Sequence, residues 1–240
     1  MIRTLVLVSI AASILCTCNA PPTDEKGRLG SEDLVMTAEA QDELTPDEIV
    51  ELFKLGNQRF LNDEWHDRDF IYEQQQTSAG QHPAAIVLSC IDSRAPAEIL
   101  FDAGIGDIFN ARVAGNVVNE DVLGSMEYSC HVAGAKVILV LGHTSCGAVK
   151  GAIDRVELGN LTGLLAKIEL AVAAVEDASG DERSSTDQTF VDAVALENVR
   201  SSINRIRETS PVLKGLEDAG EIRIVGAMYD VSTGAVAFLE

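Results

Sequence analysis

Two uninterrupted apolar runs constrain the fold of this chain more than any other feature. They are "AAIVLSC" (84–90) and "AKVILVLGH" (135–143), and both have the length of a β-strand. A strand with one face in water alternates apolar and polar residues, whereas a continuous run is typical of a parallel strand covered on both faces. Helical patterns lie between and after the two runs. We therefore predict an α/β fold with a mostly parallel central β-sheet flanked by helices.

The remaining elements follow from local signals. Thr45-Pro46-Asp47-Glu48 combines an N-cap, a proline at the first helical position and a capping-box glutamate, and predicts a helix to about Leu61. Its apolar stripe has no obvious mate in its own globule, so we expect this N-terminal helical arm to pack on a second copy. Further helices are predicted at 69–76, 96–101, 119–133, 161–176 and 188–208, and strands at 108–112, 221–230 and 234–240, the last at the edge of the sheet.

The N-terminal segment differs in composition from the rest. Residues 1–20 have one early arginine, a short apolar stretch and small residues, which predicts a secretory leader and export, for example to a bacterial periplasm. Cys18 fits a loose lipoprotein signal, and a lipid there would be the only membrane attachment; cleavage after Ala20 is the other route, although Pro21 hampers it. Residues 21–44 are rich in acids and poor in large apolar residues, which predicts a flexible linker before a domain at 45–240.

Charge excludes one class of partner. The chain has 38 acidic and 18 basic residues, for a formal net charge of −20. An acidic protein is repelled by phosphate backbones, so nucleic acid is not expected as a partner. The 46% apolar content is enough for the core of one domain.

The cysteines and one histidine suggest a metal site. Without the leader three cysteines remain, and an odd number argues against a disulfide framework. Cys90 is the last residue of one apolar run, His143 is the last residue of the other, and Cys146 follows three residues later. Because parallel strands bring their carboxyl ends to one edge of the sheet, these three residues can meet there. Two thiolates and an imidazole form a zinc set with a fourth position open, as in catalytic sites. Cys130 lies on a helical stripe and is predicted to be a core thiol.

Asp92 and Arg94 follow Cys90 within four residues. If Arg94 clamps Asp92, the carboxylate can accept a hydrogen bond from the oxygen ligand of the metal and orient it. Released from Arg94, Asp92 could instead become the fourth metal ligand and close the site. A plain surface ion pair is equally compatible with the spacing.

Three motifs together resemble a known family. "CIDSR", "RVAGN" and "GHTSCG" occur in the order and spacing of a β-class carbonic anhydrase, and the resemblance extends from about Asp47 to the C-terminus. It implies a lyase with one Zn²⁺ per chain on Cys90, His143 and Cys146. It also implies a catalytic pair of Asp92 and Arg94.

The same resemblance implies how substrate is held. Gln81 matches a glutamine that hydrogen-bonds substrate across a dimer interface. Phe109 matches an aromatic residue of the substrate pocket, and Gly147 matches a glycine whose N–H lies beside the substrate. The substrates would be carbon dioxide and bicarbonate, and the assembly a homodimer or a dimer of dimers. Val87 stands where the bicarbonate-regulated branch has tryptophan, which implies the plant-like, unregulated branch.

Two other functions are compatible with the same residues. A hydrolase of carbon disulfide or carbonyl sulfide could use the same scaffold, because those linear molecules are attacked by analogous chemistry. A non-catalytic zinc protein would keep Asp92 permanently on the metal. The presence of Arg94 favours the open site, because its role as a clamp requires Asp92 to leave the metal.

Overall fold

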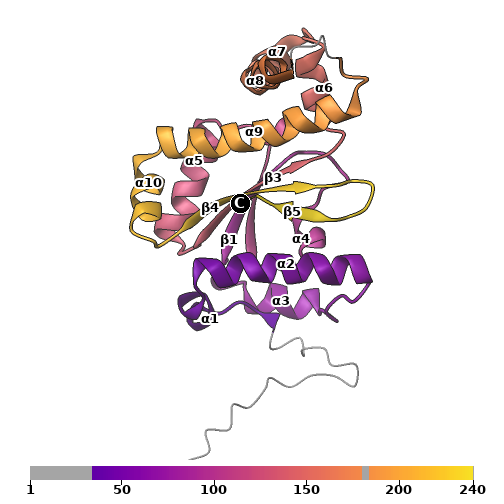
Figure 1. Ribbon diagram of the computed structural model, residues 1–240. Helices are drawn as coiled ribbons and strands as arrows, with labels where there is room; N and C mark the ends of the chain where they lie inside the picture. The colour runs from indigo at the N-terminus through magenta and orange to yellow at the C-terminus, as the bar shows by residue number, and fades with distance from the viewer. Residues whose placement is uncertain (1–33, 180–183, 240) are drawn as a thin grey trace, which may run out of the picture.

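The structure is a computed structural model that describes residues 34–179 and 184–239 (Figure 1). The predicted leader, the possible lipid attachment at Cys18 and the first part of the predicted linker lie outside the described residues. Among the described residues, no helix is both long and apolar enough to cross a membrane.

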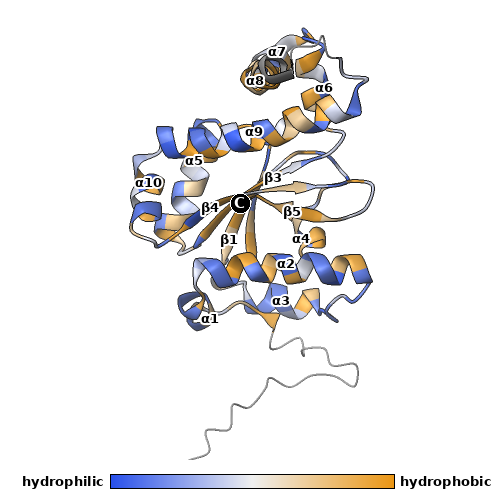
Figure 2. Cartoon of the chain, in the orientation of Figure 1, coloured by the Kyte–Doolittle hydropathy of each residue, from blue (hydrophilic) through white to orange (hydrophobic). Residues whose placement is uncertain are grey.

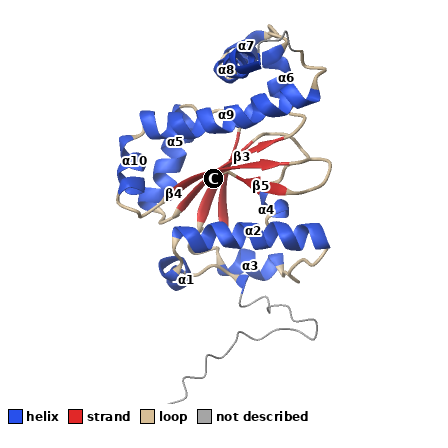
Figure 3. Ribbon diagram, in the orientation of Figure 1, coloured by secondary structure: helices blue, strands red, loops and turns tan. Residues whose placement is uncertain are grey.

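A five-stranded sheet forms the centre of the molecule, in the order β2-β1-β3-β4-β5 (Figure 3). The strands are β1 (Ala85–Ser89), β2 (Ile108–Arg112), β3 (Val137–His143), β4 (Arg223–Tyr229) and β5 (Val236–Phe238). β1 to β4 are parallel, and β5 pairs antiparallel with β4 at one edge. The predicted fold class and the predicted edge strand are therefore confirmed.

Helices cover both faces of this sheet (Figure 1). The helices along one face are α1 (Ala38–Glu43), α2 (Pro46–Asn62), α3 (Phe70–Gln76) and α4 (Ala97–Leu100). The opposite face carries α5 (Glu120–Glu127), α9 (Gln188–Thr209) and α10 (Pro211–Asp218), and beyond α9 lie α6 (Gly147–Ile153), α7 (Gly159–Leu165) and α8 (Glu169–Ser179).

Alternate residues of the central strands pack in two separate cores. In β1, Val87 packs on the side of α2, whereas Ile86 and Leu88 pack on the side of α5 and α9. Both sets are buried, which is why the run shows no polar alternation. The hydropathy colouring shows the strands as the apolar centre between amphipathic helices (Figure 2).

The segment before residue 45 differs from the prediction of a flexible linker up to residue 44. Residues 38–43 form α1, and Gln41 is buried. Its Nε2 donates to the carbonyl oxygens of Pro83 (2.8 Å) and Ala133 (2.9 Å). These buried hydrogen bonds hold the segment against the sheet, so the structured domain begins before residue 45.

The helix predicted from the capping box is confirmed as α2, with both reciprocal hydrogen bonds of the box present. The prediction that the apolar stripe of this helix packs on a second copy is wrong for the buried part of that stripe. Ile49 and Phe53 are buried against the sheet of their own chain. Leu52 and Leu55 are 44% and 48% exposed, so only the outer part of the stripe remains open.

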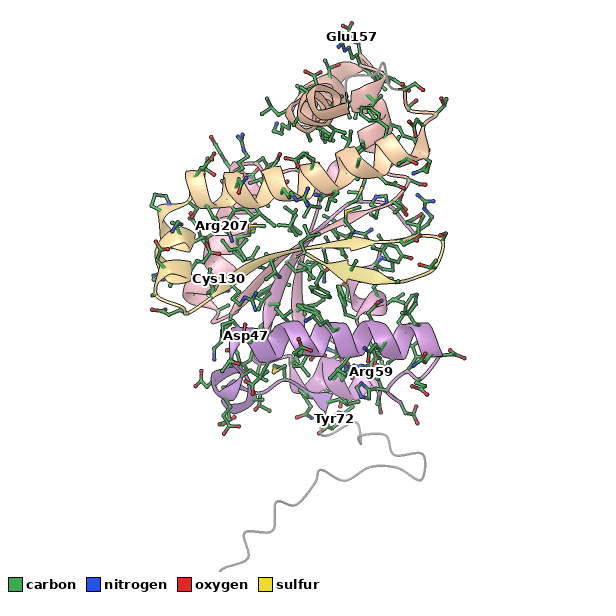
Figure 4. All side chains as sticks on the ribbon, in the orientation of Figure 1. Asp47, Arg59, Tyr72, Cys130, Glu157 and Arg207 are labelled. Carbon is green, nitrogen blue, oxygen red and sulfur yellow. The ribbon has the colours of Figure 1, made fainter. Side chains whose placement is uncertain are left out.

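Two predicted helices change character within their length. The 119–133 helix is α5 followed by a π-helical turn at Tyr128–Val132, in which Cys130 is buried as predicted (Figure 4). The 161–176 helix is divided into α7 and α8. Ile168, in the turn between them, is fully buried. Helix α10 was not predicted.

Candidate metal centre

Cys90, His143 and Cys146 converge at the carboxyl edge of the sheet. Cys90 directly follows β1, His143 is the last residue of β3, and Cys146 precedes α6. Their ligand atoms all lie within 4.8 Å of one another. The three residues are 4%, 1% and 1% exposed, and the two cysteines belong to the apolar cluster between α6, α8 and α9. The described residues thus contain the donor set that the sequence predicts.

The hydrogen bonds of His143 direct one ring nitrogen toward the cysteines. Nδ1 lies 2.9 Å from the carbonyl oxygen of Thr144, which can only accept, so Nδ1 carries a hydrogen. Nε2 is buried and has no hydrogen-bond partner in the structure. A buried nitrogen without a partner is costly unless a cation or another donor satisfies it.

The two neighbouring thiols shift each other's pKa in opposite directions. Hydrogen bonding with Cys146 is the main effect that lowers the pKa of Cys90, to about 4, although burial opposes it. The same interaction raises the pKa of Cys146. Burial is the largest single effect on His143 and acts to lower its pKa, but interactions with Cys90, Thr144 and Asp92 together outweigh it and the pKa is raised. A cation bound by these groups would displace the protons that they carry in its absence.

These residues fit a zinc ion. Two sulfur donors and an imidazole nitrogen with its lone pair directed inward are the ligands that zinc prefers, and all three cysteines of the described chain are free of disulfides. Three protein ligands leave one position for water or substrate.

Asp92 is bound to Arg94. Arg94 Nε and Nη2 donate to the two carboxylate oxygens at 2.9 and 2.8 Å, and the Arg94 amide donates at 3.0 Å. These hydrogen bonds hold the pKa of Asp92 well below its usual range, so the carboxylate is ionised. Asp92 Oδ2 lies 3.8 Å from His143 Nε2. The carboxylate is thus beside the metal ligands but engaged with Arg94, which is the open arrangement.

Arg112 and Gly115 support the Cys90 loop. Arg112 Nε donates to the carbonyl of Cys90 (2.9 Å), and its Nη2 donates to that of Asp92 (2.6 Å). The amide of Gly115 donates to Cys90 Sγ at 3.3 Å. Sequence reasoning missed both of these contacts. The only available signal was the "RVAGN" motif, which does not reveal which backbone atoms the arginine reaches.

Gly147, Gln81 and Phe109 differ in where they lie. Gly147 opens α6 directly after Cys146 and is exposed at the metal edge. Gln81 precedes β1, so the whole strand separates it from Cys90. Phe109 pairs with Ile86 and is therefore about four residues, or roughly 13 Å, from the level of Cys90. Within one chain, Gln81 and Phe109 cannot reach the metal ligands.

A family model described as "Carbonic anhydrase" matches residues 85–236. The chain is 36% identical over 184 residues to a protein named "Carbonic anhydrase 2" from Mycobacterium tuberculosis, covering 75% of this chain and 86% of that protein. It is 35% identical over 188 residues to a carbonic anhydrase of Mycolicibacterium smegmatis, covering 76% and 88%.

Solved structures show the same fold. A β-carbonic anhydrase from Sordaria macrospora, described as tetrameric, superposes with a TM-score of 0.61 and 24% identity. The match covers 70% of this chain and 89% of that chain.

Proposed function

The chain belongs to the carbonic anhydrase family, and from this premise we propose that it interconverts carbon dioxide and bicarbonate with a zinc ion on Cys90, His143 and Cys146. The observation that carries the proposal is the convergence of two thiol sulfurs and one unpartnered imidazole nitrogen within 4.8 Å, beside the clamped Asp92. Zinc held by these residues would supply a nucleophile by lowering the pKa of a bound water, which falls to about 7 in the three-histidine carbonic anhydrase.

The side chains around the ligands have separate tasks. Asp92, ionised and fixed by Arg94, can accept a hydrogen bond and hold the attacking oxygen with a lone pair toward substrate. Arg112 keeps the Cys90–Asp92 backbone in place. Space is open beside Gly147, because an added Cβ would meet no neighbouring side chain or distant backbone within 4 Å, and as the first residue of α6 it has an N–H without a partner inside the helix. Substrate oxygens can therefore approach this amide closely.

We expect the purified protein to contain about one zinc per chain and to hydrate carbon dioxide. Elemental analysis and stopped-flow assays with a pH indicator measure both properties. The same preparation should be tested with carbonyl sulfide and carbon disulfide. Zinc-loaded protein that hydrolyses either sulfur compound but does not hydrate carbon dioxide would contradict the proposal. Zinc-loaded protein inert toward all three would favour a non-catalytic zinc protein.

We also propose that the chain works as a homodimer, with a dimer of dimers as a further possibility. Gln81 and Phe109 lie away from the metal ligands of their own chain, which is where residues serving a partner's site would be. β2 is an edge strand, and a groove of about 830 Å³ follows it and α5. Exposed apolar side chains, including Ile105 and Tyr128, lie around this edge. Unpaired strand edges with apolar flanks are natural sites of association.

Mixed dimers test the contribution of Gln81. Gln81→Ala chains retain the metal ligands, whereas Cys146→Ser chains retain Gln81. Co-expression in equal amounts should give one complete site in each mixed dimer, or about a quarter of the wild-type activity per chain after random pairing. Each variant alone should be much less active. If the mixture is no more active than the mean of the two separate variants, Gln81 does not act across an interface. If the wild-type protein sediments as a fully active monomer, the proposed dimer is wrong.

Two further proposals depend on sequence features alone. Val87 stands where the bicarbonate-regulated branch has tryptophan, which supports assignment to the branch without bicarbonate regulation. The first twenty residues support export, to a periplasm or to a membrane through a lipid on Cys18.

A further inference from the structure

Helix α9 presents polar side chains to the turns that carry the metal ligands. Asn198 Nδ2 donates to the carbonyl of Gly115 at 2.7 Å in the buried interior, and Gly115 in turn donates to Cys90 Sγ. Nearer the start of the helix, Asp192 Oδ1 accepts the backbone N–H of Ser145 at 2.9 Å. One helix therefore contacts both the Cys90 side and the Cys146 side of the metal centre.

Ser145 has an unusual backbone conformation. Its φ of 57° lies in the left-handed region, which is disfavoured for residues with a Cβ. Ser145 directly precedes Cys146 and is two residues after His143, so its conformation sets the directions of both ligands. A non-glycine residue remains in this region only when surrounding contacts hold it there.

Asp192 is itself held in place. Gln188, one helical turn earlier, donates from Nε2 to the same Oδ1 at 2.7 Å. The position of α9 over β3 is fixed by close packing at Gly142, where an added Cβ would lie 2.5 Å from Val199 Cγ2. The carboxylate therefore meets the Ser145 amide from a helix that cannot shift freely.

We propose that Asp192 is a positioning residue of the metal centre, which holds Ser145 in the left-handed conformation so that His143 and Cys146 face the metal together. The inference rests on the proposed function in that it takes these residues as zinc ligands. Asp192 acts through the Ser145 backbone and does not itself touch metal or substrate.

The test is the rate at which zinc passes from the protein to an excess of a chromophoric chelator. Asp192→Ala should release zinc about 10- to 100-fold faster than wild type, the range typical for loss of a residue that orients a ligand. Asp192→Asn should stay close to wild type, because the amide oxygen can still accept from Ser145. Glu197→Ala, on the same helix and paired with Arg200, is the matched control and should not change the rate.

A second substitution separates positioning from general loss of stability. Ser145→Gly in the Asp192→Ala background removes the penalty of the left-handed conformation and should restore most of the slow zinc release, although it replaces no lost contact of α9. The cobalt-substituted protein should show the same rescue in its sulfur-to-metal absorption. Zinc release from Asp192→Ala as slow as from Glu197→Ala, or no rescue by Ser145→Gly, would overturn the proposal. These readouts do not depend on carbon dioxide hydration, so they remain decisive if the proposed reaction is wrong.

Discussion

Replacement of Cys146 by serine should remove almost all zinc and all carbon dioxide hydration. The thiolate supplies a soft, charged donor, whereas a serine hydroxyl stays protonated near neutral pH and binds zinc poorly. Cys146 is buried beside Cys90 and His143, so its replacement leaves only two of the three ligands of this cluster. We expect zinc affinity to fall by about 100-fold or more, beyond the effect of losing an orienting residue. Elemental analysis after dialysis and stopped-flow hydration assays give the two quantities.

Cys130→Ala is the matched control for removal of a cysteine. Cys130 is buried in the cluster with Val122 and Met126, and burial raises the pKa of its thiol to about 12. It therefore stays protonated and unreactive at about pH 8 in the folded protein. The alanine variant should keep its zinc and near-normal activity. Stoichiometric zinc in Cys146→Ser, or loss of zinc in Cys130→Ala, would contradict the ligand assignment.

Replacement of Arg94 by alanine should abolish most activity while the metal stays bound. The substitution removes both hydrogen bonds from the guanidinium to Asp92 and leaves only the one from the backbone amide of residue 94. The freed carboxylate already lies 3.8 Å from His143 Nε2 and can take the fourth position on the metal. We expect kcat to fall by about 10- to 100-fold, with zinc content unchanged. Hydration kinetics measured alongside zinc content test this separation, and the cobalt-substituted protein reports four protein ligands by its absorption.

Arg94→Lys is the informative companion variant. Lysine keeps the positive charge but cannot make the paired Nε and Nη2 hydrogen bonds to a carboxylate. Its activity should lie between those of wild type and the alanine variant. Simultaneous loss of zinc and activity in Arg94→Ala would mean that Arg94 maintains the site itself, and the two positions proposed for Asp92 would be wrong.

Much of the fold was predictable because it depends on local or repeating patterns. The capping box at Thr45 predicts the start of α2, and the structure contains both of its hydrogen bonds. The two apolar runs predict parallel strands, since a strand buried on both faces has no polar alternation. The division of the 161–176 helix was not predictable in this way. The apolar pattern there, with Leu165, Ile168 and Val172 all buried at helical spacing, is compatible with one continuous helix, and no local signal in the sequence marks the break.

The metal ligands were predictable for a similar reason. The carboxyl ends of parallel strands meet at one edge, so residues at the ends of β1 and β3 must lie near each other. The role of Arg112 was not predictable to the same degree. Its two backbone acceptors lie 22 and 20 residues earlier in the chain, and no local pattern identifies them.

The sequence by itself determined the strands of the central sheet, the start of α2, and which donors meet at the carboxyl edge of the sheet. Those properties depend on residue type and periodicity along a short stretch of chain. Only the tertiary structure decided that Asp192 reaches Ser145, that Gly115 reaches Cys90, and that α1 packs against the sheet through Gln41. These contacts join residues between 25 and 92 positions apart. They exist because close packing of whole elements, such as α9 on β3 at Gly142, brings particular polar atoms within hydrogen-bonding distance.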